Sequence, residues 1–344
     1  MDAIAIYYNN IIICWSSIII CAGIIVGFLI SNSFYSARNK YGFGAWVYLP
    51  LAIGSSVFLS RIIHWYCHME QYSDFKTAIT RYDTGDYCMI GVLIGTWIIA
   101  LLMQLTKLVP DRYNLLDAFA PGIAFTMGII RLSDIYNTSC RGKILVNNPK
   151  YQHLPIASAT IDAAGNIQYR FATFFVSFIL FMIATLIIVV FSICTHHTKY
   201  KTPAKSKGHT YRLFLLLFAV SEIIMDSTRY DASHLYFSGE KLAFLNKGAS
   251  FMGLSQFLGA LLCIYLFTYY MTISIKANGK DKKHIILLLT YLVGFIIAGV
   301  SEYLVQRYSS MYLVYYGSQS FGVILVMLSV LLAYKTCILL PKDK

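Results

Sequence analysis

A group of charged and amide side chains ends an otherwise apolar segment that runs from Asp117 to Gly142. A proline and two glycines interrupt the segment, and its polar end carries Arg131, Asp134, Asn137 and Arg141. These residues are expected where the segment leaves the hydrocarbon of a membrane. Ionisable side chains at such a depth are costly, so by default they indicate a functional site. The alternative is that Arg131 extends to the interface and pairs with Asp134, one helical turn later.

A second charged group lies between Ser221 and Asp231. On a helix, Glu222, Asp226 and Arg229 are spaced i, i+4 and i+7 and therefore share one face. Three ionisable groups on one face should point into the protein. The alternative is a helix that emerges into water with a solvated charged face.

The composition predicts that these groups are carried by an all-α polytopic membrane protein. Hydrophobic residues make up 58% of the 344, charged residues only 13%, and the mean hydropathy is +0.62. This is more apolar surface than a soluble core could bury. The sequence offers about nine spans of near ~20 residues each, at 10–31, 44–65, 88–108, 114–132, 171–195, 211–229, 249–273, 284–304 and 314–338.

The basic residues predict the orientation of the chain. The two most basic loops, at 196–210 and 274–283, are separated by two spans and so lie on one side of the membrane. The bias of Lys and Arg toward the cytoplasm places both loops and the C-terminus inside and the N-terminus outside. The net charge of +12 is thus mostly a topology signal. A nucleic-acid partner is not expected in so apolar a chain.

The motifs of several enzyme classes are missing. The sequence has no Walker loop, no H-E-x-x-H, no G-x-S-x-G and no Rossmann fingerprint. The eight cysteines form no C-x-x-C pair, and their spacing predicts no metal site. His64 and His68 are four residues apart and could share a metal, but without a third ligand in register polar packing is expected.

Four blocks of the sequence resemble the prolipoprotein diacylglyceryl transferase family. Asp117-Ala-Phe-Ala-Pro121, followed by Gly128 to Gly142, resembles its D-x-x-A-P and G-R-x-G-N-F-x-N-x-E-x-x-G signature. The other blocks resemble G-G-R-L-G, F-R-x-x-x-E-F-x-R-x-P-D and M-G-Q, and they are residues 59–63, 218–231 and 252–256. The resemblance covers about residues 10–275, so residues 1–275 are expected to form a seven-span domain. Residues 276–344 would add two transmembrane helices and a short cytoplasmic tail.

The resemblance implies a reaction and a site. Diacylglyceryl would move from phosphatidylglycerol, or a similar anionic membrane lipid, to the cysteine thiol of a lipoprotein precursor, without a cofactor. The place would be the outer side of a bacterial-type plasma (inner) membrane. Arginine suits the lipid phosphate, and the thiol must become a thiolate to react. The residues expected at the substrates are Arg131, Arg229, Arg61, Arg141, Asn137 and Glu222, and the catalytic candidates are Asp226, Asp134 and His64.

The chain departs from the family pattern at positions that matter for this chemistry. Met89-Ile90-Gly91 stands where the family has a histidine-glycine pair, so that proton acceptor is missing. Glu222 stands where the family has an arginine, which reverses the charge. The second hypothesis is therefore a non-catalytic relative that binds lipid or peptide or serves as an assembly subunit. For the two added spans, which carry Glu302 and several tyrosines, the expected role is structural anchoring.

Overall fold

The structure is a computed structural model of the 344-residue chain. It describes residues 4–8, 11–38, 43–67, 72, 74–80, 87–136, 141–145, 155–161, 165–197, 207–229, 253–279, 281–307 and 311–338.

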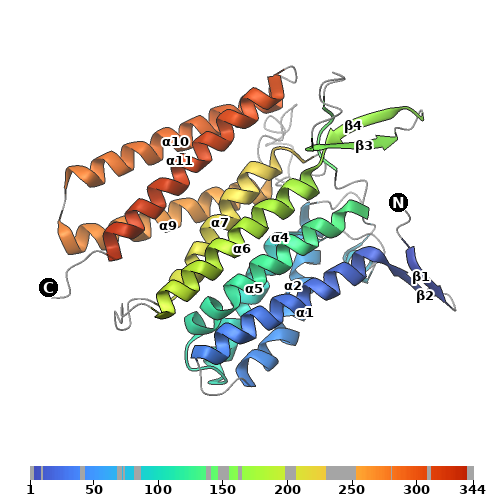
Figure 1. Ribbon diagram of the computed structural model, residues 1–344, viewed down its shortest axis with the longest axis horizontal. Helices are drawn as coiled ribbons and strands as arrows, with labels where there is room; N and C mark the ends of the chain where they lie inside the picture. Colours follow the sequence, from blue (N-terminus) through green and yellow to red (C-terminus); the bar gives the residue numbers. More distant parts are fainter. Residues whose placement is uncertain are drawn as a thin grey trace. The chain divides into compact units, whose positions relative to one another are not determined.

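Helices make up most of the described chain, as Figure 1 shows. They are α1 (Trp15–Arg38), α2 (Phe43–Cys67), α3 (Phe75–Thr80), α4 (Met89–Leu105), α5 (Arg112–Ser133), α6 (Thr173–His197), α7 (His209–Asp226), α9 (Leu254–Asn278), α10 (Lys282–Arg307) and α11 (Tyr312–Ile338). A 3-10 turn, η2 (Asp134–Tyr136), extends α5. Two antiparallel hairpins pair β1 (Ile4–Tyr8) with β2 (Ile11–Cys14) and β3 (Ala157–Ile161) with β4 (Ile167–Phe171).

Seven of the described helices are long and apolar enough to cross a membrane: α1, α2, α5, α6, α9, α10 and α11. Each coincides with one of the predicted spans. The other two predicted spans correspond to α4, with 17 residues, and α7, whose 18 residues include three charged ones, and neither meets the same combination of length and apolar composition. The predicted all-α, multi-pass membrane protein is confirmed.

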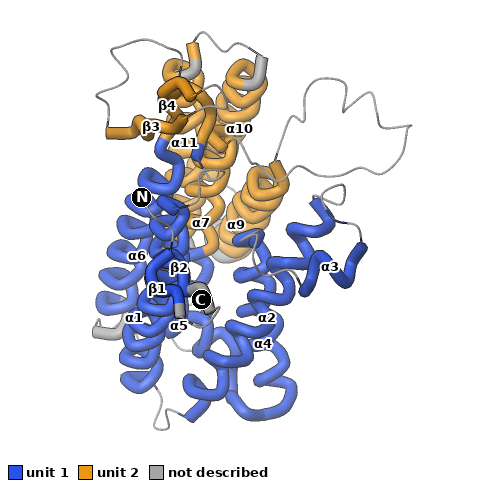
Figure 2. The backbone as a smooth tube through the Cα atoms, turned by 90° about the vertical axis from the view of Figure 1, so that its right-hand side faces the viewer, with its two compact units in different colours: residues 1–141, 172–214, 233–236 blue, residues 142–171, 215–232, 237–344 orange. Residues whose placement is uncertain are grey.

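The chain forms two compact units, coloured separately in Figure 2. Unit 1 contains α1 to α6 and the first residues of α7, up to Phe214. Unit 2 contains β3 and β4, the rest of α7 from Leu215, and α9 to α11. The predicted division of the chain at residue 275 concerns function and stays a prediction.

Unit 1 is built around α5, which is the most buried of its membrane-spanning helices. Pro121 lies inside this helix without ending it. A Cβ on Gly27 of α1 would lie 2.7 Å from the carbonyl oxygen of Gly122 in α5, so the two helices approach closely at these glycines. Gly91 of α4 likewise lies against the backbone of Ser60 in α2. The glycines of the sequence blocks thus bring helices together and do not break them.

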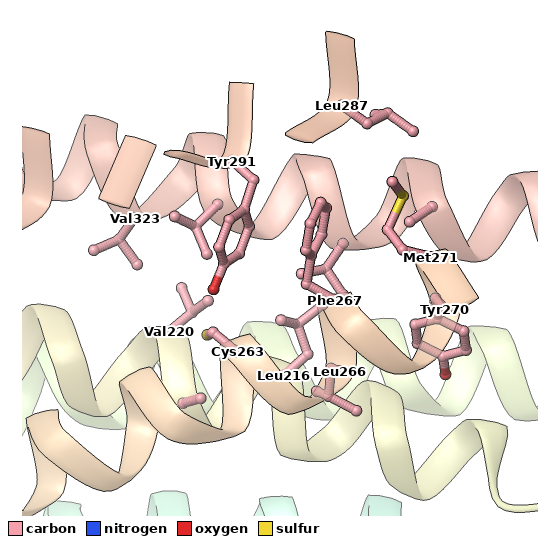
Figure 3. Packing of buried hydrophobic residues seen from close by; sticks show 14 residues of the cluster. Leu216, Val220, Cys263, Leu266, Phe267, Tyr270, Met271, Leu287, Tyr291 and Val323 are labelled. Atoms are coloured by element: carbon pink, nitrogen blue, oxygen red, sulfur yellow. The ribbon is translucent and has the colours of Figure 1, made fainter. Parts of the chain in front are cut away.

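Unit 2 has its own hydrophobic core between α7, α9, α10 and α11 (Figure 3). Phe267 and Tyr291 stack with their ring centroids 4.1 Å apart, above Cys263 and Val220. Helices α10 and α11 run side by side, and small residues permit their contact. A Cβ on Gly322 would lie 2.7 Å from the Gly294 carbonyl oxygen.

Candidate functional site

Arg131 lies near the end of α5 and is shielded by protein, with 8% of its surface exposed. Its Nη1 lies 3.9 Å from Oδ2 of Asp134, which is partly exposed on η2. The expected burial of Arg131 is confirmed, and an ion pair with Asp134 exists as well, although at a distance longer than a good hydrogen bond. Arg141 is partly buried, and Asn137 lies outside the described residues.

Asp117, which opens the same sequence block, has a structural role. Its buried carboxylate accepts hydrogen bonds from the backbone N–H of Gly208, at 2.7 Å, and of Tyr211, at 2.8 Å. These donors belong to the start of α7, where backbone N–H groups have no helical partner. Gly208 has a φ of +84°, a conformation that glycine adopts readily. Asp117 therefore caps α7 from a different helix, within unit 1.

Arg61 and His64 come together at the end of α2. Arg61 is 2% exposed, and its Nε donates to the carbonyl oxygen of Ala78 at 2.9 Å. Its guanidinium lies 5.8 Å from the ring centroid of Tyr72 and 5.4 Å from that of Tyr87. The Tyr72 hydroxyl is 3.1 Å from Nδ1 of His64. Two aromatic faces and a carbonyl oxygen thus stabilise the charge of this buried cation.

Glu222 and Asp226 are both buried in unit 2, with 1% and 4% of their surfaces exposed. The inward orientation predicted from their i, i+4 spacing is confirmed for this pair. The prediction that Arg229 continues the same helical face is wrong, because α7 ends at Asp226. Arg229 follows the helix, forms an isolated bridge with Gly142 and is partly buried.

Asp226 also meets the start of α9. Its carboxylate lies against Gly253, so closely that a Cβ at this position would overlap the carboxylate oxygen Oδ2. Gly253 is the residue before the first helical residue of α9. The positive end of a helix favours a nearby carboxylate. The glycine of the M-G-L-S-Q block thus makes room for Asp226.

Lys143 joins the same group, although it was not among the predicted site residues. Its N–H donates to the Thr228 carbonyl oxygen at 2.9 Å, and its own carbonyl accepts from the Phe171 N–H at 3.0 Å. These bonds hold Lys143 between the end of α7 and the end of β4. Burial lowers the pKa of the Lys143 ammonium, and the negative charges of Glu302 and Asp226 oppose that change in pKa.

A chain of four buried polar side chains links α7, α11, α10 and α9. The Ser227 hydroxyl donates to Oε1 of Gln319 at 2.8 Å, and Nε2 of Gln319 donates to Oε2 of Glu302 at 2.6 Å. The same Glu302 oxygen accepts from Nε2 of Gln256 at 3.0 Å. Oε1 of Gln256 in turn accepts from the N–H of Gly253 at 3.2 Å. Of these four side chains, none was named as a site residue from the sequence.

Each unit carries buried charged side chains that could bind an anion or accept a proton. In unit 2 the carboxylates of Glu222, Asp226 and Glu302 are buried, and Lys143 and Arg229 are the cations near them in the chain or in space. In unit 1 the buried cations are Arg61 and Arg131. Across the described residues, no group of three or more His, Cys, Asp and Glu side chains is arranged to hold a metal ion.

Comparison with known proteins identifies one family. The family model described as prolipoprotein diacylglyceryl transferase matches residues 3–265. This range includes Arg61, Arg131, Lys143, Asp226 and Gln256, and it ends within α9. No curated protein matches the chain.

Proposed function

The chain belongs to the prolipoprotein diacylglyceryl transferase family, and on this premise we propose that it moves diacylglyceryl from phosphatidylglycerol to a cysteine of a lipoprotein precursor. The membrane would be a bacterial-type inner membrane and the reacting side its outer face. The partners are then an anionic membrane lipid and the precursor peptide. A transferase role follows from the family, and its specific substrates are part of the proposal.

The reaction needs one proton acceptor and several cations. A thiolate sulfur of the precursor attacks the glyceryl carbon that is bonded to the phosphate oxygen, so that a C–S bond forms and a C–O bond breaks. The thiol proton goes to a base of the protein, and glycerol phosphate leaves as an anion. Only the thiolate is a competent nucleophile, and cations stabilise the phosphate as its charge increases.

One observation carries the proposal: a buried carboxylate and a partly buried ammonium come from two segments that are hydrogen-bonded to each other within the family-matched region, since the Lys143 N–H donates to the Thr228 carbonyl oxygen. Asp226 is the carboxylate and Lys143 the ammonium. We assign Asp226 to the thiol proton and Lys143, with Arg229, to the phosphate. The basic group compensates in part for the negative charge of Glu222, which the family pattern would make an arginine.

The groups of unit 1 are assigned to the lipid by their chemistry. Arg131 and Arg61 are buried, permanently charged and suited to bidentate phosphate binding. Arg141 and Asn137 remain proposed ligands of the same headgroup. Asp134 and His64 remain alternative proton acceptors, and His64 has a hydroxyl partner in Tyr72 that can fix its ring.

The test is the transfer of labelled diacylglyceryl into a precursor, in membranes that lack any other transferase. Asp226→Asn should lower the rate by about 10²- to 10⁴-fold, the usual contribution of a general base. Lys143→Met should raise the KM for phosphatidylglycerol. Lys283→Met, which removes an exposed ammonium from α10, is the matched control and should change neither constant.

The second candidate function is a non-catalytic relative that binds lipid or peptide or assists assembly. It is favoured by the burial of Glu222, because an acidic side chain stands there within a region that must accept an anionic lipid. Absence of transfer by unmutated protein that is folded and inserted would select this alternative.

The orientation of the chain is a further part of the proposal. With the N-terminus outside and the C-terminus in the cytoplasm, a single cysteine introduced at Ser206 in a cysteine-free background should be shielded from an impermeant thiol reagent in intact cells. A cysteine at Gly239 should react under the same conditions. Labelling of the first and protection of the second would reverse the orientation.

A further inference from the structure

Two helices outside the family match contribute polar residues to the group around Asp226 and Lys143. The match ends at residue 265, whereas Glu302 lies in α10 and Gln319 in α11. Both side chains are buried, with exposures of 6% and 1%. Polar groups buried at this depth cost free energy unless they are paired. A pair of helices that served only to anchor the chain in lipid would not need them.

Hydrogen bonds connect α10 and α11 to the end of α7 and to the start of α9, which both lie within the family match. Oε1 of Gln319 accepts a hydrogen bond from the hydroxyl of Ser227, which is one residue after the end of α7. The hydroxyl of Tyr316 in α11 donates to the Ser227 carbonyl oxygen at 2.9 Å. Glu302 accepts from Gln256, which itself holds the Gly253 N–H beside Asp226. Helices α10 and α11 therefore hold two backbone positions next to Asp226: Ser227, which follows it in the chain, and Gly253, against which its carboxylate lies.

The charge of Glu302 has a separate use. A neutral glutamine at position 302 could accept the same two amide hydrogen bonds through its carbonyl oxygen, so the network alone does not require a carboxylate. A buried charge is costly unless an opposite charge compensates it. Burial lowers the pKa of Lys143, and the negative charges of Glu302, from α10, and of Asp226, from α7, oppose that change in pKa. The negative charge of Glu302 thus favours the protonated form of Lys143.

We propose that Glu302 is a positioning residue of the transferase site, which orients Gln256, and through it the Gly253 N–H beside Asp226, by a hydrogen bond and adds a negative charge to the group that includes Lys143. This inference rests on the proposed function. It makes α10 and α11 part of the enzyme, and it distinguishes them from the anchoring role expected from the sequence. Glu302 itself does not touch the reacting atoms; it acts through Lys143 and Gln256.

The decisive variant is Glu302→Gln, which retains the shape and the acceptor oxygen and removes the charge. Without this carboxylate the pKa of Lys143 falls, so Lys143 loses its proton at a lower pH. The alkaline limb of the kcat/KM profile should therefore move to lower pH. On that limb the KM for phosphatidylglycerol should rise about tenfold, the size expected when a charged hydrogen-bond acceptor is lost, while kcat changes little.

Two further variants separate charge from packing. Glu302→Asp retains the charge on a shorter side chain and should leave the alkaline limb in place, although KM rises. Gln256→Met removes the amide that Glu302 binds and should raise KM without moving the limb. The control is Ser329→Ala in α11, whose buried hydroxyl donates only locally, to the Leu325 carbonyl oxygen at 2.8 Å. It should reproduce the unmutated profile.

The outcomes discriminate between the two proposals. If the unmutated protein transfers diacylglyceryl and Glu302→Gln leaves both KM and the alkaline limb unchanged, the role of Glu302 is wrong and the proposed function stands. If the folded, unmutated protein transfers nothing, both are wrong. If Glu302→Gln does not fold, Glu302→Asp and Gln256→Met decide: normal KM values for both would overturn the inference.

Discussion

The two units stabilise buried charge in different ways. In unit 1, Arg61 lies against two tyrosine rings and donates to the Ala78 carbonyl oxygen. In unit 2, Glu302 and Asp226 act on the ammonium of Lys143, and two amides hold Glu302. Tyrosine rings and a carbonyl oxygen stabilise a cation without carrying a full negative charge themselves. A cation among carboxylates is partly compensated, so its strength depends on each neighbour. We therefore expect unit 1 to respond to the geometry of its arginines and unit 2 to the number of its charges.

Apart from the loss of the proposed base Asp226, the largest expected effect is at Arg131, where geometry should matter more than charge. Arg131→Ala should lower kcat/KM by roughly 10²- to 10³-fold, as loss of a group that stabilises transition-state charge does. Arg131→Lys retains the charge but loses the planar fork, so it should rescue little of the activity. Transfer kinetics on folded protein provide the measurement. Normal lipid binding and transfer by both variants would remove Arg131 from the headgroup site.

Gly253→Ala should have the next largest effect, because its Cβ would overlap the Asp226 carboxylate. The carboxylate or the start of α9 must move, and we expect transfer to fall on the order of 30-fold, since small displacements of catalytic groups are costly. Gly299→Ala in α10 is the matched control. Its Cβ would meet no neighbour, and it should leave transfer unchanged and stabilise the helix by about 0.5–1 kcal/mol. Equal activity of both variants would contradict the position of Asp226.

Charge changes in unit 2 should have opposite effects on lipid affinity. Glu222→Gln removes a buried negative charge and should tighten the binding of phosphatidylglycerol vesicles roughly tenfold, about 1.4 kcal/mol. Arg229→Gln removes a positive charge and should weaken it by a similar factor. Vesicle co-sedimentation at low salt measures both, with neutral phosphatidylcholine vesicles as the control. Changes of the same sign would show that packing, and not charge, dominates at these positions.

The smallest effect on transfer is expected at Asp117, although it opens the sequence signature. Asp117→Ala leaves the N–H groups of Gly208 and Tyr211 without their acceptor and should lower the free energy of unfolding by about 1–3 kcal/mol. Transfer per folded molecule should not change. Thermal unfolding in detergent is the measurement, and Asp74→Ala, which removes an exposed cap of α3, should cost much less. A selective loss of transfer would give Asp117 a role in the site.

The fold and part of the site could be predicted from the sequence because their signals are local. Hydropathy over about 20 residues identified each membrane-spanning helix. The i, i+4 spacing of Glu222 and Asp226 predicted their shared inward face. The end of α7 at Asp226 could not be predicted, since Ser227 and Thr228 follow without the glycine or proline that usually marks a helix end. Arg229 was misplaced on the helix for that reason.

Lys143 and Glu302 escaped prediction because their positions depend on distant parts of the chain. Lys143 is held by hydrogen bonds to Thr228 and Phe171, which no local pattern announces. Glu302 lies in an apolar helix near several tyrosines, and that composition is typical of an interfacial anchor. A single buried carboxylate in a spanning helix is itself a signal of function. The sequence contained this signal at Glu302, but the surrounding tyrosines favoured the interpretation as an interfacial anchor.

The most direct test is the release of labelled glycerol phosphate from headgroup-labelled phosphatidylglycerol by the purified, vesicle-inserted protein. The assay compares a precursor peptide that carries the acceptor cysteine with the same peptide carrying serine. A transferase should release one glycerol phosphate for each thioether-linked peptide with the cysteine substrate, and none with the serine substrate. Absence of release with the cysteine peptide, from protein shown to be folded, would contradict the proposed function and leave a lipid-binding or assembly role.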